Sequence, residues 1–566
     1  MEITWLKKIK EVIRNKIEFV IFCCALFLGS VAILFFYKRG MLTVLVDENA
    51  HLNIARQLID SMTPGFSQLG LWPPLIHIVI SPFVQIDFLW HSGLAGSIPS
   101  VLFFAITCVY VFKTVKLFSK DNLPAILSVI VFGFNPYVLY FSTVAMMEML
   151  FFMNFIIATY YFMKWIKNDY LFNLIICALF ITLSCLTRFE GFILPIILIA
   201  IILIRYLLLR KKYPQIESIV IIFSMLSCFG IFLILLYNIV FAGNPFAFIS
   251  GEWSAYAQQH EGGYILPAKG NFLYASLYML SAAKYMISIE LILISLIIFF
   301  VLILRKNYLK IILLVILIVP FVFNIISLFK GNSVVYTPDF HSNNFLNVRY
   351  GLSLIPFVSI SIGIFLASFL KRKKIISILK YCYGGIIVVM VFTFLIFNLS
   401  YNDSIIVKDA KNYPSKEMIQ SAKIFKKEYD GGKLLITRGI NDFFTKNSGI
   451  NISDMIQESN YIYWEQSLEE PWLFARWVVA LNPDSSMIWE VKKDEISTKW
   501  IGDNKIYEFY DVVLKNDTYI ILKINENAMM DYVKENNLNI NKMPSMNISI
   551  KHWDPSTIKN EIENEK

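Results

Sequence analysis

Two adjacent carboxylates, Asp47 and Glu48, follow the first long apolar segment of the chain. A carboxylate held at a membrane boundary can act as a general base, because it can remove the proton of a hydroxyl or amine acceptor. The same pair could instead serve the helix that follows, with Asp47 as its N-cap and Glu48 as a favourable anion in the first turn. Considered alone, the two residues fit both roles, and the rest of the chain has to distinguish them.

Three further ionisable residues are expected at the same boundary. Glu148 opens an apolar segment, and since a carboxylate against lipid is costly, it should face a cavity or a partner. Arg56 and Arg349 could bind a phosphate, although an arginine at the end of a span can also extend to lipid headgroups. Transfer from a membrane-embedded phosphate ester needs such a set, because a carboxylate activates the acceptor and arginines stabilise the departing phosphate. Asp47, Glu48 and Glu148 are therefore the predicted catalytic residues.

Four other residues are candidates for supporting roles. Arg188 and Glu190 occupy a short turn between two apolar segments, where the favoured interpretation is a local ion pair that seals the turn. His77 and His341 could be polar anchors or site residues, because a single histidine indicates little by itself.

The elements that position these residues are predicted to be membrane helices. Of the 566 residues, 57% are hydrophobic and 16% are charged, which excludes a soluble protein of this size. Basic residues fall in alternate loops, which predicts a cytoplasmic N-terminus in a plasma-membrane protein. The seven cysteines lie in apolar runs, so no disulfide framework is expected. The eleven predicted spans are 17–38, 92–115, 122–141, 147–166, 170–187, 190–209, 216–241, 284–304, 309–329, 350–370 and 375–399.

Two outer segments are predicted to lie along the membrane rather than across it. Residues 72–90 are apolar but carry prolines, and counting them as a span would invert every later loop. We therefore predict a juxtamembrane or re-entrant helix there. Residues 49–62 have apolar side chains at helical spacing, which predicts an amphipathic helix in the interface with Arg56 near headgroup depth.

The composition changes sharply after residue 400. The residues from 401 onward contain 21 Lys and Arg and 26 Asp and Glu, with short apolar runs beside a helical-looking segment. This predicts an all-α polytopic membrane domain over 1–400, a small α/β extracytoplasmic domain over 401–527 and a polar C-terminal tail over 528–566.

Several motifs together resemble the GT-C integral membrane glycosyltransferases. They are the acidic pair after the first span, the interfacial helix, "WPPLIH", Glu148 at the start of the fourth span, "LTRFEG" and "NVRYGLSLIP". Their order and common sidedness over about residues 17–400 are most similar to the glycosyltransferase family 39 branch, which contains protein O-mannosyltransferases and lipid A aminoarabinose transferases. A soluble domain at the C-terminus also occurs in the wider superfamily.

The resemblance implies roles for individual residues. Asp47 matches the first-loop acidic residue that acts as general base or positions the acceptor. Glu148 matches the second-loop acidic position, which is usually aspartate in the aminoarabinose branch. The lysine-proline that precedes the juxtamembrane helix in that branch is replaced here by Trp72-Pro73, so one phosphate-binding cation is missing and Arg349 is the candidate replacement. This departure argues against the aminoarabinose activity itself.

The resulting hypothesis is an inverting glycosyltransferase that works on the extracytoplasmic side. The donor would be a sugar on polyprenyl phosphate, and the acceptor a protein, a glycan or a lipid. No nucleotide site and no nucleic-acid partner are expected, because no Gly-rich phosphate loop is evident. The three carboxylates could bind a hard divalent cation, but the first loop has no D-x-D, which favours transfer without metal or other cofactor. The alternative hypothesis is a transporter or flippase for a lipid-linked sugar.

Overall fold

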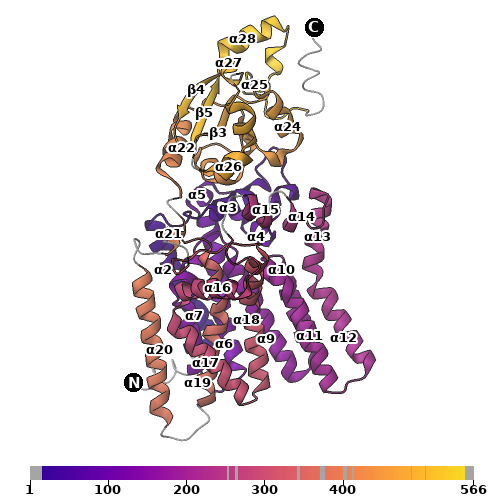
Figure 1. Ribbon diagram of the computed structural model, residues 1–566, viewed down its shortest axis with the longest axis vertical. Coiled ribbons are helices and arrows are strands. Elements are labelled where there is room, and N and C mark those ends of the chain that lie inside the picture. The colour runs from indigo at the N-terminus through magenta and orange to yellow at the C-terminus, as the bar shows by residue number, and fades with distance from the viewer. Residues whose placement is uncertain are drawn as a thin grey trace, which may run out of the picture.

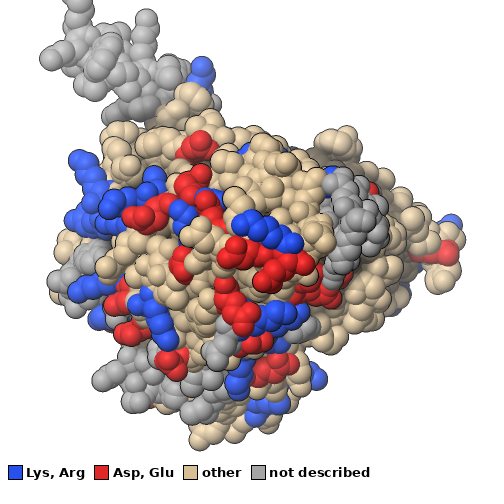
Figure 2. Space-filling model, turned by 90° about the horizontal axis from the view of Figure 1, so that it is seen from above, with Lys and Arg blue, Asp and Glu red and all other residues tan. Residues whose placement is uncertain are grey.

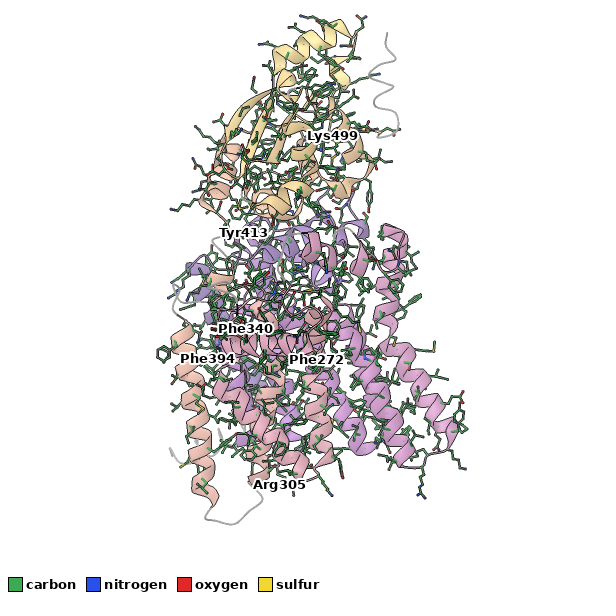
Figure 3. All side chains as sticks on the ribbon, viewed as in Figure 1. Phe272, Arg305, Phe340, Phe394, Tyr413 and Lys499 are labelled. Atoms are coloured by element: carbon green, nitrogen blue, oxygen red, sulfur yellow. The ribbon has the colours of Figure 1, made fainter. Side chains whose placement is uncertain are left out.

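The computed structural model describes residues 16–554 apart from 252–253, 262–265, 341–344, 370–375, 400–404, 411–412, 486 and 504. His341, one of the predicted supporting residues, therefore lies outside the described residues. The chain forms an elongated molecule with a helical bundle at one end and an α/β domain at the other (Figure 1). Arg305, from a predicted cytoplasmic loop, lies at the end of the bundle far from the α/β domain (Figure 3).

Seven segments of the described chain are long and apolar enough to cross a membrane, and two bent helix pairs raise the number to nine. The protein is therefore an integral membrane protein. The remaining two predicted spans, 122–141 and 170–187, hold the shorter helices α7 (Leu123–Gly133), α8 (Pro136–Phe141) and α10 (Leu171–Cys185). The seven segments are α2 (Ile17–Lys38), α6 (Leu94–Lys116), α9 (Glu148–Asn168), η2 (Phe189–Phe192) with α11 (Ile193–Leu208), α18 (Tyr308–Lys330), η3 (Val348–Leu354) with α19 (Ile355–Phe369), and α20 (Ile376–Asn398).

The two bent pairs differ in geometry. Helices α12 (Tyr213–Ser227) and α13 (Phe229–Ala242) meet at 45° and form one broken span. Helices α16 (Phe272–Ile287) and α17 (Ile289–Leu304) meet at 116°, and Ser288 between them has a φ of 103°. Helix α16 therefore lies across the bundle (Figure 1), whereas the sequence analysis assigned most of it to a loop and its last residues to a span.

Three short helices lie between the bundle and the α/β domain (Figure 1): α3 (Val46–Gln57), α4 (Leu75–Val84) and α5 (Asp87–Ser92). Helices α4 and α5 occupy the segment that was predicted not to span the membrane. The prediction for α3 was wrong, because this helix does not lie in the lipid interface. All its residues from Glu48 to Gln57 are buried, and helix α23 (Asp442–Asn447) of the α/β domain packs on it. An amphipathic pattern does not reveal whether lipid or protein covers the helix.

The α/β domain contains a five-stranded sheet of order β2-β1-β3-β5-β4. Strands β1, β2 and β3 are parallel, and β5 is antiparallel to both β3 and β4. Leu435 and Val478 face one apolar cluster while Leu434 and Val479 face another, so both faces of the sheet are covered, as parallel strands require. The strands are β1 (Leu434–Ile436), β2 (Met455–Ile456), β3 (Trp477–Leu481), β4 (Tyr510–Lys515) and β5 (Tyr519–Ile524).

Short helices surround this sheet, and acidic and basic side chains are interspersed over the exposed end of the molecule (Figure 2). The packed structure extends beyond residue 527, where a polar tail was predicted. Met529, Met543 and Trp553 are buried in the cluster on one face of the sheet. The helices are α22 (Lys416–Glu428), α23, α24 (Ile462–Glu469), α25 (Pro471–Phe474), α26 (Ile488–Lys493), α27 (Ile506–Phe509) and α28 (Glu526–Glu535), whereas α21 (Ile405–Asp409) packs on the apolar cluster of the membrane domain.

Candidate active site

The two opening carboxylates have different environments. Helix α3 begins at Val46, and the Glu48 carboxylate accepts a hydrogen bond of 2.9 Å from the backbone N–H of Leu45. Glu48 therefore caps the helix, and Asp47 does not. The Glu48 side chain is fully buried, and its other oxygen lies 2.5 Å from the hydroxyl of Tyr140. Glu48 is committed to these contacts and does not join the other predicted catalytic carboxylates.

The contacts of Tyr140 indicate the protonation state of Glu48. The single hydroxyl of Tyr140 contacts two acceptors, Glu48 Oε1 at 2.5 Å and the carbonyl oxygen of Met41 at 3.0 Å. One hydroxyl proton cannot serve both. The conflict disappears if a protonated Glu48 donates to Tyr140 and Tyr140 donates to Met41. In agreement, burial raises the pKa of Glu48 to about 7, although the hydrogen bonds from Tyr140 and Leu45 oppose the rise.

Asp47 instead faces an arginine. Its carboxylate forms an ion pair with Nη2 of Arg349, in η3 at the N-terminal end of the α19 span. The Asp47 side chain is 30% exposed and that of Arg349 is 12% exposed, so the carboxylate is the accessible partner. A Cβ on Gly351 would lie 2.4 Å from the backbone of Ala282 in α16. Glycine at this position therefore lets η3 approach α16 closely and fixes the site of Arg349.

Glu148 belongs to the same cluster of charges. Its Oε1 lies 2.7 Å from Nη1 of Arg188 and 4.0 Å from Nε of Arg349, while its Oε2 is buried without a partner among the described residues. The turn before α9 is held against α6, where a Cβ on Gly96 would lie 2.4 Å from Ala145. This close contact fixes the beginning of α9 and with it Glu148.

The expected ion pair between Arg188 and Glu190 is present. Arg188 contacts Glu190 Oε1 at 2.7 Å through Nη2, and Nε lies 3.1 Å from both oxygens of the carboxylate. Because Arg188 also bonds Glu148, the turn is part of the larger cluster. The ring of Tyr350 lies 5.8 Å from the Arg188 guanidinium and 5.7 Å from that of Arg349. Three carboxylates and two arginines thus form one network at the beginnings of α3, α9, α11 and α19.

A pair of histidines adjoins this network, and the sequence analysis identified only one of them. His51 Nδ1 lies 2.8 Å from Nε2 of His77, and both rings are buried beside Trp72. Burial, together with the positive charges of Arg349 and Arg188, lowers the pKa of His51 to about 3. His51 is four residues after Asp47, hence on the same helical face, and this spacing was the available signal.

Arg56, a predicted phosphate ligand, lies elsewhere. It forms ion pairs of 2.8 Å with Asp60 and with Asp87, donates to the carbonyl of Val84 at 2.7 Å, and stacks on Trp90. Nine residues of α-helix separate it from Asp47, which corresponds to about 13 Å and the opposite face. Arg56 therefore fixes α3 to α4 and α5, and the prediction that it joins Arg349 is corrected.

The carboxylates of the site are engaged with other protein groups. In the part of the chain that the structure describes, no group of three or more His, Cys, Asp or Glu residues is placed to hold a metal ion. Glu48 is turned toward Tyr140, and Asp47 and Glu148 are each paired with an arginine. These residues therefore do not fit a divalent cation.

The α/β domain completes the surroundings of α3. Asn53 Nδ2 donates to the carbonyl and the carboxylate of Asp442, both at 2.9 Å, and Gln57 donates to Gln457 at 2.6 Å. Tyr413 lies at the junction of the two domains (Figure 3). The sequence analysis assigned no function to any residue of this domain, because the contacts join positions almost 400 residues apart.

Comparisons with known proteins agree with this architecture. Residues 72–232 match the family described as dolichyl-phosphate-mannose-protein mannosyltransferase, and this segment includes Glu148, Arg188 and Glu190. The structure is similar to the crystal structure of ArnT from Cupriavidus metallidurans bound to undecaprenyl phosphate. The TM-score is 0.50 at 11% identity, and the match covers 89% of this chain and 97% of that chain. The protein has the GT-C fold.

The match over residues 72–232 and this fold agree with the GT-C resemblance predicted from the sequence. The structural match also confirms the fold class, a polytopic helical domain followed by a small α/β domain. No curated protein matches the chain in sequence.

Proposed function

We propose that this GT-C protein is a membrane glycosyltransferase that moves a sugar from a polyprenyl-phosphate donor to an acceptor on the extracytoplasmic side. The observation that carries the proposal is the ion pair between Asp47 and Arg349. It places a partly exposed carboxylate beside a guanidinium at the outer ends of the membrane helices, where a lipid phosphate and a water-soluble acceptor can meet. The undecaprenyl phosphate in the crystal structure of ArnT supports a lipid-phosphate donor.

The ion pair supports a specific order of events. The donor phosphate competes with Asp47 for Arg349, because a guanidinium binds either anion through parallel N–H donors. Once displaced, the Asp47 carboxylate is free to accept the proton of the acceptor. The acceptor oxygen or nitrogen attacks the anomeric carbon on the face opposite the phosphate. The bond from that carbon to the phosphate oxygen breaks with inversion, and Arg349 stabilises the charge on the released polyprenyl phosphate.

Glu148 and Arg188 have supporting roles in this proposal. Arg188 is held by Glu190 and in turn holds Glu148, whose second oxygen has no described partner. That oxygen can accept a hydrogen bond from the acceptor and orient it toward the anomeric carbon. His51 and His77 fill the space behind Asp47 as a neutral pair, since the low pKa of His51 prevents a further positive charge there.

The proposal is tested with purified full-length protein in nanodiscs and a panel of polyprenyl-phosphate sugars. Wild type should turn over at least one donor, which mass spectrometry would detect as released polyprenyl phosphate and glycosylated acceptor. Asp47→Asn should lose about 10²- to 10⁴-fold in rate, the usual contribution of a general base. The matched control is Asp531→Asn, because Asp531 is an exposed carboxylate of α28. Full turnover by Asp47→Asn would refute the catalytic role, and movement of intact donor across the bilayer without cleavage would indicate a flippase.

A further inference from the structure

The edge of the α/β sheet that faces the membrane domain is the one at which open α/β sheets bind ligands. Strands β1 and β2 are parallel and both end at the junction with α3. The residue that follows β2, Gln457, bonds Gln57 of α3, and Asp442, beyond β1, bonds Asn53. Ligands of open α/β sheets bind outside the carboxyl ends of the strands. In this protein that edge is directed at the outer side of the proposed active site.

Arg438 stands at this edge, two residues after β1. Its backbone N–H donates to both carboxylate oxygens of Glu458, at 3.1 and 3.0 Å. These bonds hold the backbone of Arg438 in place. The residue is only partly buried, and no described residue forms a hydrogen bond or ion pair with its guanidinium, although its charge acts on the nearby carboxylates of Asp442 and Glu458. The next residue, Gly439, has a φ of +81° and open space where a Cβ would be. Arg438 is thus a partly exposed cation whose backbone is held in place, and the space beside Gly439 is open.

The surroundings of Arg438 connect it to the proposed site. The turn that follows it, η4 (Gly439–Asn441), contacts α3. Its positive charge contributes, after burial and the neighbouring His51, to the low pKa of His77. His77 in turn bonds His51, which is influenced by Arg349 and Arg188. The turn after Arg438 therefore adjoins α3, the helix that carries Asp47 and His51.

The other cations near the site are paired or enclosed, which distinguishes them from Arg438. Arg188 and Arg349 are matched by Asp47, Glu148 and Glu190, so the network is not positive overall. Lys446 of α23 also has no described partner, but its amine is fully enclosed beside Glu48 and cannot be reached by a ligand. Arg438 differs from them because it is partly exposed and its guanidinium forms no hydrogen bond or ion pair among the described residues.

We propose that Arg438 binds an anionic group of the acceptor, a phosphate or a carboxylate, while Arg349 serves the donor phosphate. This inference rests on the proposed function and specifies the acceptor as an anionic molecule. The α/β domain then contributes directly to substrate recognition. An acceptor anion held at Arg438 would lie where the α/β domain meets α3, the helix that carries Asp47.

Chemical labelling tests the site without requiring turnover. Phenylglyoxal modifies free guanidinium groups, and peptide mass spectrometry reports the rate at each arginine of the full-length protein. Arg438 should react faster than Arg476, whose guanidinium is held by Asp430 and Glu526. Glycerol 3-phosphate or glycerate should slow the reaction at Arg438 several-fold, and neutral glycerol should not. The two anions distinguish a phosphate from a carboxylate preference. An unreactive Arg438, or a rate that both anions leave unchanged, would overturn the proposal.

A second measurement separates acceptor from donor binding. Arg438→Gln should leave the affinity for undecaprenyl phosphate unchanged, as should Lys515→Gln, an exposed control that removes the same charge from β4. Arg349→Gln should weaken that affinity. A loss of carrier binding in Arg438→Gln would place Arg438 in the donor site and contradict the inference. If wild type shows no sugar transfer at all, the proposed function fails, while the labelling result still decides whether Arg438 binds anions.

Discussion

Arg349 and Asp47, which are 302 positions apart in the sequence, form the ion pair at which η3 meets the beginning of α3. The pair joins the last part of the membrane domain to the first outer loop. Its two members have different proposed functions, one toward the donor phosphate and one toward the acceptor, so substitutions of each should have separable effects.

Arg349→Gln should weaken donor binding and slow the reaction. The loss of charge-assisted contacts of about 1.5–3 kcal/mol corresponds to roughly 10- to 100-fold in affinity. Arg349→Lys should recover only part of this, because an ammonium cannot replace the planar fork. The affinity for undecaprenyl phosphate, measured in nanodiscs, gives the result. Asp47→Asn is the comparison, since it should keep or improve carrier binding while losing turnover. Equal carrier affinity in Arg349→Gln and wild type would contradict the assignment.

Glu48→Gln should retain the fold, because the contacts of Tyr140 and the raised pKa of Glu48 favour its protonated form. Glutamine can keep an acceptor for Leu45 and a donor for Tyr140, whereas Glu48→Ala should cost about 1–3 kcal/mol by leaving these groups unpaired. The raised pKa of Glu48, about 7, means that its contribution to stability is present at low pH and disappears as pH rises through 7.

The measurement for Glu48 is the thermal unfolding midpoint of solubilised protein between pH 4.5 and 8. Wild type should lose stability across this range, and Glu48→Gln should show a smaller loss. Burial also raises the pKa values of Asp442 and Asp494, to about 6. These two residues should therefore preserve part of the decrease of the unfolding midpoint with pH in Glu48→Gln. An identical slope in both proteins would show that Glu48 is ionised throughout.

Lys446→Met should stabilise the protein or leave its stability unchanged. Burial lowers the pKa of Lys446 to about 7, against the opposing influence of Glu48, and the amine has no described hydrogen-bond partner. Because this pKa is depressed in the folded state, wild type should gain stability as pH rises above 7, and the methionine variant should lack this gain. Thermal unfolding at pH 7 and pH 9 compares the two. A large destabilisation at both pH values would show that the amine makes a necessary contact.

Arg56→Gln should reduce stability without a specific effect on the donor. Its guanidinium connects Asp60, Asp87 and Val84, so its removal should cost about 2–4 kcal/mol. The fraction that remains folded should bind undecaprenyl phosphate with wild-type affinity. Asp87→Asn is a milder companion variant, because its carboxylate is largely exposed. If folded Arg56→Gln protein bound the carrier more weakly than wild type, Arg56 would be assigned to the donor site after all.

The spans of the membrane domain could be predicted because hydrocarbon thickness sets the length of an apolar helix. Every predicted span coincides with at least one described helix, and the segment around Trp72 forms two short helices, α4 and α5, rather than one helix of span length. Helix α16 was missed because its apolar residues run directly into α17, and the sharp turn at Ser288 has no glycine or proline to mark it.

The site could be predicted in part for similar reasons. Asp47, Glu148 and Arg349 were selected as ionisable residues at one membrane boundary, and the structure brings them together. Arg56 was predicted to join the site only because of its expected depth in the membrane, although helical periodicity places it opposite Asp47. His51 was missed despite its spacing of four from Asp47. Arg438 and Lys446 could not be found, because only the docking of the α/β domain on α3 brings them near the site.

The shortness of α7 and α10 has a consequence for the bilayer. A helix of 15 residues, such as α10, extends about 22 Å, which is less than the hydrocarbon thickness of roughly 30 Å. Local thinning of the bilayer around such helices is one of the ways in which this hydrophobic mismatch is relieved. Headgroups would then settle toward the level of Glu148 and Arg349, so that a carrier phosphate could reach the site without withdrawing its isoprenoid chain from the membrane.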